Sequence, residues 1–298
     1  MINRLIDSGI GCNVLGVLIN AIGYADDLSL LCPTAKGLQQ LISICEEYGN
    51  EFDVNFNLTK SECILFRNKK NCNYPIMTLC NKELKWKETV ECLGHKITYN
   101  LDDDIDIVYR RNEFYSKFND VFSDFYFVDE LTLVKLLKAH CCTYFGAVTY
   151  DFMNCSISSL NNSFKVALRK IWNVPRETHS NLILSLSESC SVHTSIYKRY
   201  VNLYNRVIDE NRNMIIDFFF KLGEFGFVRT VTGRNLNFLK RKFGDDLISN
   251  NIKDASLSQQ ELNILDQIKE LIDVRKYFLI DLLTKNEIQM ILDFICTM

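Results

Sequence analysis

The sequence predicts an α+β fold, in which a β-rich segment built around one long helix is followed by a mainly helical region. Short apolar runs separated by polar turns occupy the first 100 residues, and they are interrupted by a helical period at 35–52. From about residue 105 onward, apolar residues recur at helical spacing instead. Strands first and helices afterwards are typical of an α+β chain.

The first apolar run, residues 14–25, reads as buried β-structure, and a second run, "LSLLC", begins at Leu28. Asp26 and Asp27 separate the two runs. Two apolar runs joined by a two-residue polar tip predict a β-hairpin. Asp-Asp is not a favoured turn pair, which indicates that these two residues serve a purpose other than turn formation.

The next segment is expected to be one amphipathic helix. Pro33 ends the strand, Thr34 offers an N-cap, and the helix spans residues 35–52. One face of it is apolar and the other polar, so we expect it to pack on a sheet with one side in water. The apolar face contains Leu38, Leu41, Ile42, Cys45, Tyr48 and Phe52.

Further β-elements are expected before residue 100. Residues 57–61 read as a turn and 62–67 as a strand. A hairpin is expected around Asn81-Lys82, and 90–98 reads as a strand–turn element with Gly94 at its bend.

The acidic run at 100–106 marks the change to helices, because a helix N-terminus favours negative charge. The helices expected after it are 105–124, 129–147, 157–173, 190–219, 235–249, 258–275 and 277–296.

Composition limits the classes of function. The 298 residues are 47% hydrophobic and 24% charged, which is ordinary for a globular protein. The formal net charge of -3 argues against a free-standing nucleic-acid binder with a basic surplus, so any such role must be local. The twelve cysteines show no zinc-site spacing and predict free thiols in a reducing compartment, the cytoplasm or nucleus. The run at 14–25 is too short to cross a bilayer, so no membrane association is expected.

Adjacent carboxylates on a hairpin suit two-metal phosphoryl transfer. Carboxylates are the hard oxygen ligands that Mg²⁺ prefers. In such sites, two ions about 3.5–4 Å apart stabilise the attacking and leaving oxygens. The plainer interpretation of Asp26 and Asp27 is an exposed polar turn, and their sequence context decides between the two.

That context is a resemblance. "YADD", the helix after it, the turn "NLTKS" and the element "ECLGHKIT" resemble, in order and spacing, the palm of non-LTR (LINE-type) retrotransposon reverse transcriptases. The resemblance implies a nucleotidyltransferase, an RNA-directed DNA polymerase that adds nucleotides to a primer 3′ end. It implies that Asp26 and Asp27 bind Mg²⁺ or Mn²⁺ and that Lys60 protonates the leaving pyrophosphate. The implied partners are an RNA template, a DNA primer and a dNTP.

The resemblance extends to about residue 215. Leu93, Gly94 and His95 match the element that grips the primer end, although Cys92 stands where the family has an aromatic residue. "DDDIDI" and "ALRKIWNVPRETHSN" resemble the thumb and the region after it. The resemblance therefore implies a partial palm at 1–100, a helical thumb-like region at 101–180 and a C-terminal helical region at 181–298. It assigns no function to residues 215–298.

The family's polymerase also uses a third carboxylate on an earlier strand and a basic fingers region, and neither is found here. Asp151 in "TYDFMN" resembles the missing strand only superficially and lies in a helical region. We therefore expect a truncated reverse transcriptase that binds Mg²⁺ weakly and is inactive alone. The missing palm and fingers could act in trans.

Basic residues could contact a template–primer backbone. Lys165, Arg169, Lys170 and Arg176 could form such a stripe, with a solvated helix face as the equal alternative. Residues 229–244 are the most basic segment, but Asp245-Asp246 follow at once, which favours a surface helix.

Two other hypotheses stay open. The first is a non-catalytic helical module, derived from such an element, that binds nucleic acid or protein. Nucleic-acid binding that is insensitive to Asp26→Ala would favour it. The second is a relic that folds poorly because its sheet lacks strands, which leaves an open edge and an uncovered apolar face.

Overall fold

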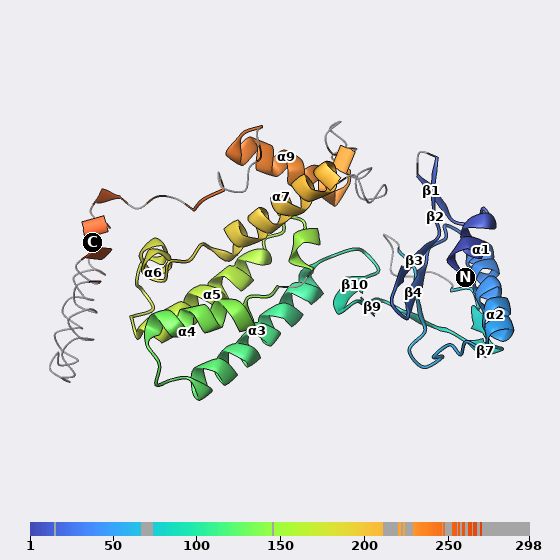
Figure 1. Cartoon of the computed structure of the whole chain (residues 1–298), viewed down its shortest axis with the longest axis horizontal. Helices are drawn as coiled ribbons and strands as arrows, with labels where there is room; N and C mark the ends of the chain where they lie inside the picture. Colours follow the sequence, from blue (N-terminus) through green and yellow to red (C-terminus); the bar gives the residue numbers. More distant parts are fainter. Residues whose placement is uncertain are drawn as a thin grey trace. The chain divides into compact units, whose positions relative to one another are not determined.

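A computed structural model describes residues 1–14, 16–66, 74–144, 146–210, 220, 221, 223, 229–245, 247 and individual positions between 252 and 269. The chain divides into two compact units, Met1–Asp102 and Asp103–Met298. The first combines short strands with helices, and the second is helical in the part described (Figure 1). The chain therefore has the mixed helical and stranded content predicted from the sequence.

The N-terminal unit begins with a short helix that the sequence did not predict. The first elements are α1 (Ile2–Asp7), β1 (Cys12–Val14), β2 (Val17–Ile19), β3 (Ala21–Tyr24) and β4 (Asp27–Leu30). Most of 14–25 is β-structure as predicted, but it is divided between two hairpins, and β3 is largely exposed and not buried. β1 and β2 form one antiparallel hairpin and β3 and β4 another.

Two residues explain why the run is broken. Gly16 has φ 89°, a conformation that glycine adopts without steric cost, and its N–H donates to Asn13 Oδ1 at 2.9 Å. Asn20 is 2% exposed, and its side-chain amide donates to the carbonyls of Leu5 and Ile10 at 2.6 and 2.9 Å. A buried amide must have such partners, so Asn20 ties β2 to the chain around α1.

Helix α2 (Ala35–Phe52) has the bounds predicted for it. Thr34 is its N-cap and accepts a hydrogen bond from the Gly37 N–H at 3.2 Å. Leu41, Ile42 and Cys45 are buried, with Leu41 at the centre of a cluster with Leu5. Phe52, expected on the apolar face, is 53% exposed. It packs against Tyr48, with the Arg4 guanidinium over both rings.

Short strands complete this unit, namely β5 (Glu62–Ile64), β6 (Thr78–Leu79), β7 (Lys82–Glu83), β8 (Lys85–Lys87), β9 (Thr89–Cys92) and β10 (His95–Thr98). β5 pairs in parallel with β8, whereas β6–β7 and β9–β10 are antiparallel hairpins. The strand expected at 62–67 is shorter, ending at Ile64. The turn expected at Asn81-Lys82 lies at Cys80-Asn81, where both residues have positive φ.

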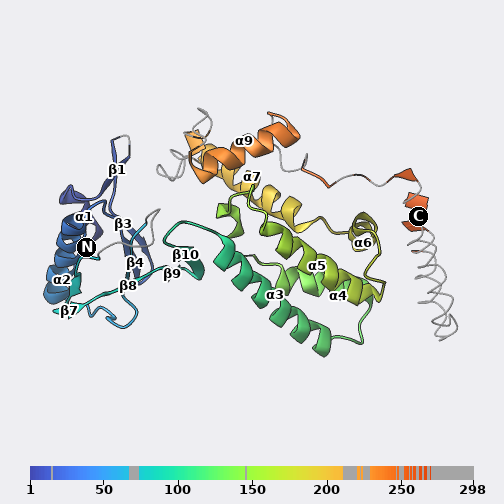
Figure 2. The ribbon, with the colours of Figure 1, turned by 180° about the vertical axis from the view of Figure 1, so that it is seen from behind.

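The second unit is built around one central helix. Its elements are α3 (Asp104–Asp124), α4 (Glu130–Leu136), a π-helical turn η1 (Leu137–Cys141), a 3-10 turn η2 (Ala147–Thr149), α5 (Ile157–Trp172), α6 (Ser180–Leu186), α7 (Val192–Glu210) and α9 (Val231–Phe243). α5 contacts α3, α4, α6 and α7, and both views of the ribbon show it between them (Figures 1 and 2). Leu160, Phe164 and Leu168 lie on its buried face, four residues apart.

Some helix predictions need correction. The helix expected at 129–147 ends at Cys141, and a π-helical turn closes it. α6 was not predicted at all. α9 begins four residues earlier than predicted, because Thr230 accepts a hydrogen bond from the Gly233 N–H at 3.0 Å and caps it there. It also ends at Phe243 and not at 249, because Gly244 with φ 96° closes it. The last predicted helix, 277–296, lies outside the described residues, as do 211–219 of the helix predicted at 190–219 and 270–275 of the one predicted at 258–275.

The acidic run starts α3 as predicted, but its carboxylates also bind other parts of the unit. Asp103 accepts a hydrogen bond from the Asp151 N–H at 2.9 Å. Asp106 is fully buried and accepts a hydrogen bond from the Tyr150 hydroxyl. Arg110, one turn later, lies 3.6 Å from the same carboxylate. These contacts fix the start of α3 against the segment around η2.

Candidate functional site

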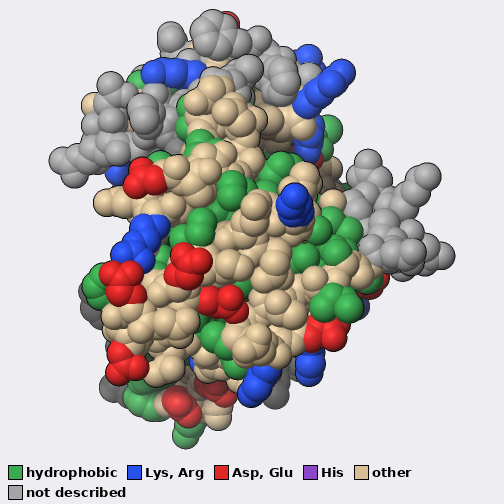
Figure 3. All heavy atoms as spheres, turned by 90° about the vertical axis from the view of Figure 1, so that its right-hand side faces the viewer, with side chains coloured by type: hydrophobic (Ala, Val, Ile, Leu, Met, Phe, Trp, Pro, Cys, Tyr) green, Lys and Arg blue, Asp and Glu red, His purple; other side chains and the backbone are tan. Residues whose placement is uncertain are grey.

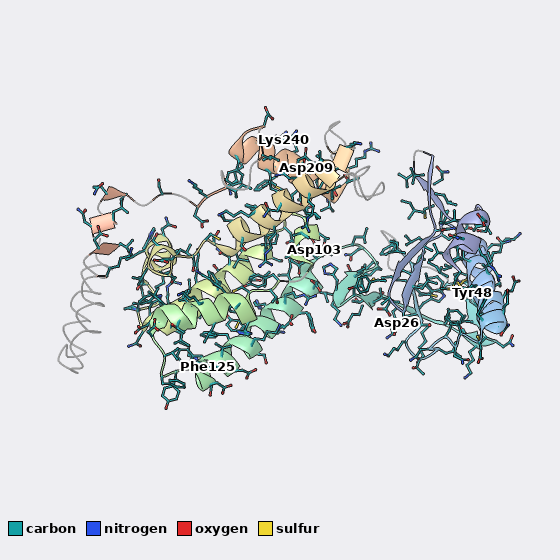
Figure 4. All side chains as sticks on the ribbon, in the orientation of Figure 1. Asp26, Tyr48, Asp103, Phe125, Asp209 and Lys240 are labelled. Carbon is teal, nitrogen blue, oxygen red and sulfur yellow. The ribbon has the colours of Figure 1, made fainter. Side chains whose placement is uncertain are left out.

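The β3–β4 hairpin carries the two adjacent aspartates at its turn. Tyr24 pairs with Asp27, so the two turn residues are Ala25 and Asp26, and Asp27 is the first residue of β4. The predicted hairpin is thus present, but its tip is one residue earlier than the Asp26–Asp27 pair proposed from the sequence. Figure 4 labels Asp26 at the end of this hairpin.

The turn has an unfavourable backbone conformation. Ala25 has φ 52°. For a residue with a Cβ atom this left-handed region costs about 1–2 kcal/mol, because Cβ approaches the following carbonyl oxygen. Glycine or asparagine would fill the position at lower cost. Eight other described non-glycine residues, among them Asp53 and Asn173 at helix ends, also have positive φ, so the strain makes this turn costly but does not by itself mark a functional site.

The two carboxylates are exposed and uncompensated. Among the described residues, neither the Asp26 nor the Asp27 side chain makes a hydrogen bond or an ion pair. Adjacent negative charges repel each other, and no described cation pairs with them. Both features leave the carboxylate oxygens available to bind a cation.

The outer face of the hairpin leads from the aspartates to a second motif. Side chains alternate along a strand, so Asp27 and Ser29 lie on one face of β4 and Leu28 and Leu30 on the other. Leu28 and Leu30 pack towards α2. Ser29 Oγ lies 3.8 Å from Sγ of Cys92, the last residue of β9.

That contact joins the hairpin to the turn between β9 and β10. His95 pairs with Cys92, so the turn residues are Leu93 and Gly94, with φ 50° and 75°. Two consecutive positive φ values are the pattern of a tight two-residue hairpin. The predicted bend at Gly94 is confirmed, and Leu93 at the turn is 41% exposed.

Lys60 lies in a tightly closed turn. The Asn57 side-chain oxygen accepts hydrogen bonds from the backbone N–H groups of Thr59 and Lys60 at 3.1 and 3.3 Å. The Asn57 carbonyl accepts from the N–H groups of Lys60 and Ser61 at 3.1 and 3.0 Å. This arrangement is the asparagine turn expected for "NLTKS". The Lys60 side chain is exposed and pairs with no carboxylate among the described residues.

A metal would find two carboxylate donors at this site. Within the described residues, no cluster of three or more His, Cys, Asp or Glu side chains is arranged to hold an ion. Asp26 and Asp27 fit Mg²⁺ or Mn²⁺ by donor type, because these ions prefer oxygen ligands. By donor number, the pair is an incomplete site.

The four cations proposed as a basic stripe have different surroundings. Arg169 donates to the Thr178 carbonyl at 2.7 Å and so holds the loop after α5. The Lys170 ammonium lies 4.4 Å from the centroid of the Phe122 ring. Burial lowers the pKa of Lys165, and the nearby Arg169 lowers it further. Arg176 is exposed. Two of the four are therefore engaged in packing the helical unit.

The most basic segment forms α9, and its cations are also partly engaged. Arg234 makes an ion pair with Asp151 at 2.8 Å. Lys242 lies over the rings of Tyr197 and Phe238. Arg241 is exposed. This placement agrees with the surface-helix interpretation of the segment.

Sequence reasoning missed Ser29 and Ala25. Ser29 could have been found, because period-2 alternation places it on the face of Asp27. Its contact with Cys92 spans 63 residues and carries no sequence signal.

The Figure 3 view shows hydrophobic side chains exposed on one face of the molecule among acidic and basic ones. Ile22 and Tyr24 on β3 are 54% and 66% exposed.

None of the protein-family models compared matches this chain, and no curated protein matches it. No helix that the structure describes is long and apolar enough to span a bilayer.

Proposed function

We propose that this chain carries part of the catalytic palm, and a thumb-like helical unit, of a non-LTR retrotransposon reverse transcriptase. In this proposal Asp26 and Asp27 supply two of the carboxylates that hold the catalytic ions, Mg²⁺ or Mn²⁺. The observation that supports it best is a strained hairpin turn with two exposed, unpaired carboxylates, linked through Ser29 and Cys92 to the Leu93–Gly94 turn.

The residues around the pair have distinct roles in this proposal. The bound ions would stabilise the attacking and leaving oxygens of nucleotidyl transfer. Leu93, Gly94 and His95 would position the primer end, with Ser29 and Cys92 fixing their turn relative to the aspartates. Lys60, presented by the Asn57 turn, would give a proton to the leaving pyrophosphate. RNA template, DNA primer and dNTP are the substrates.

A two-carboxylate site is expected to bind metal weakly. A divalent ion held by one acidic pair keeps most of its coordination shell as water. A third carboxylate, supplied by a further segment of the polymerase, would complete the shell and permit primer extension. We expect the chain by itself to bind Mn²⁺ weakly and to extend no primer.

The first test is Mn²⁺ binding followed by water-proton relaxation. The Asp26→Asn/Asp27→Asn double variant should lose the binding, and Glu47→Gln, which removes an exposed carboxylate on α2, should keep it. Mn²⁺ binding that survives the double variant contradicts the proposal.

The second test is primer extension on an RNA template, with Mg²⁺ or Mn²⁺, measured for the unmodified chain and for Asp26→Ala. Extension that this variant abolishes would show a complete site and would overturn the expectation of weak binding.

The helical unit supports a second candidate, a non-catalytic nucleic-acid-binding module. Among its described residues a hydrophobic cluster extends from α3 to α9, and Arg176 and Arg241 are exposed. This candidate predicts RNA–DNA duplex binding that Asp26→Ala leaves unchanged and Arg176→Ala/Arg241→Ala weakens. Binding lost in Asp26→Ala alone favours the polymerase instead.

A further inference from the structure

We propose that the turn between α3 and α4 docks a protein partner whose surface offers an apolar pocket rimmed by lysine or arginine. Three consecutive aromatic residues, Phe125, Tyr126 and Phe127, form this turn and are called the aromatic tip. They are 39%, 74% and 71% exposed. Figure 4 labels Phe125 at the end of α3, where side chains project away from the helices. The proposal is independent of the metal site assigned to Asp26 and Asp27, because it involves no residue of the first unit.

The aromatic tip is closed by backbone hydrogen bonds. The Phe125 N–H donates to the Val121 carbonyl at 3.0 Å, and the Val128 N–H donates to the Phe125 carbonyl at 3.1 Å. The Tyr126 and Phe127 rings meet edge to face, with centroids 5.9 Å apart and an interplanar angle of 88°. Rings that are already ordered lose little conformational freedom on binding, which favours affinity.

Among the described residues, no core element covers the aromatic tip. Earlier in α3, Phe114 and Phe118 are 1% and 3% exposed and belong to the core. Tyr126 and Phe127 instead leave large apolar surfaces in water. Exposed aromatic clusters mark interaction sites, and tyrosine is enriched among the residues that dominate binding energy.

Charge around the aromatic tip selects the class of partner. Residues 118–134, which lie between Lys117 and Lys135, contain four carboxylates and no lysine or arginine, and Lys117 pairs with Glu113 at 2.8 Å. Three of these carboxylates, those of Asp120, Asp124 and Asp129, belong to exposed residues. Nucleic-acid phosphates and anionic lipid headgroups would be repelled here, since both classes are bound through lysine and arginine. A protein surface with a cationic rim is complementary.

The chain itself contains a contact of the proposed kind. The Lys170 ammonium lies 4.4 and 5.4 Å from the ring centroids of Phe122 and Phe118, one to two turns before the aromatic tip. Cations are attracted to the negative face of such rings. Lysine or arginine at the rim of a partner would find the same ring faces on Tyr126 and Phe127, together with the carboxylates.

The test uses the full chain and designed peptides as probes. A fluorescent amphipathic helix of leucine and lysine is titrated, beside one of leucine and glutamate and a lysine–serine peptide that lacks the apolar face. The Tyr126→Ala/Phe127→Ala variant removes the exposed rings, and Met153→Ala is the matched control, because Met153 is 68% exposed in another loop of the same unit. Thermal unfolding should be unchanged in both variants, since the deleted side chains are exposed.

We expect the leucine–lysine peptide to bind the chain, and the double variant to weaken that binding by at least about tenfold. The control variant should bind as the unmodified chain does, and the other two peptides should bind much more weakly. Equal peptide binding by the double variant would overturn the proposal. A double variant that instead loses binding to a single-stranded oligonucleotide, to anionic vesicles or to a second copy of the chain would overturn it too.

Discussion

Asp106 shows how one residue connects distant parts of the helical unit. Its carboxylate is fully buried, accepts the Tyr150 hydroxyl and lies 3.6 Å from Arg110. A buried charge without partners would be strongly destabilising, so these contacts are required for the fold. The pKa of Tyr150 is raised, mainly because the hydroxyl is buried and also because it donates a hydrogen bond to Asp106. Within the acidic run at the start of α3, Asp106 therefore has a structural role.

His193 gives the helical unit a pH dependence. Burial lowers its pKa, and Lys242 and Lys165 lower it further, while Asp254 opposes them. A histidine with a lowered pKa in the folded state binds fewer protons than the unfolded chain, whose value is near 6.5. Its contribution is complete above pH 6.5 and is lost as the pH falls through the folded-state pKa.

We therefore expect urea unfolding to show a stability loss as the pH falls below about 6.5, part of which His193→Gln removes. The carboxylates titrate both in the unmodified chain and in His193→Gln, so their contribution to the pH dependence drops out of the difference between the two. Identical pH profiles would show that His193 does not contribute.

At the scale of elements, α2 was predictable because every signal for it is local. Thr34 caps it, the apolar residues recur at steps of three and four, and Asp53 ends it in the left-handed conformation. α1 and α6 have six and seven residues, too few to display a helical period. The helix expected at 129–147 failed for another reason, since its apolar spacing persists while the backbone changes to a π-turn at Leu137.

The cap of α2 can be tested directly. Thr34→Ala removes the acceptor for the Gly37 N–H and should lower the free energy of unfolding by about 1 kcal/mol. Thr34→Ser keeps the hydroxyl and should retain most of the stability. Both are measured by urea denaturation. Equal losses in the two variants would show that the methyl group of Thr34, and not its hydroxyl, is what α2 requires.

At the scale of the whole molecule, the sequence predicted the mixed α and β content and the positions of local hairpins, but not which distant residues contact each other. The hairpin with Asp26 and the bend at Gly94 were predictable from local patterns. The Ser29–Cys92 contact and the Asp106–Tyr150 hydrogen bond join residues 63 and 44 positions apart. No local propensity encodes such pairs, because packing of the complete unit brings them together.

The hydrophobic clusters of the described residues each lie within one unit. Leu41 belongs to a cluster of the first unit and Leu168 to that of the second, and both side chains are fully buried. Leu→Ala at either position removes packing contacts and leaves a cavity, which costs about 2–5 kcal/mol.

Because no cluster crosses the division, we expect each substitution to destabilise one unit only. Hydrogen–deuterium exchange should accelerate in α3, α5 and α7 for Leu168→Ala, with α2 unchanged. For Leu41→Ala it should accelerate in α2, with the helical unit unchanged. Equal acceleration in both units by either variant would mean that the chain unfolds as one cooperative body, and the two cores would then depend on each other for stability.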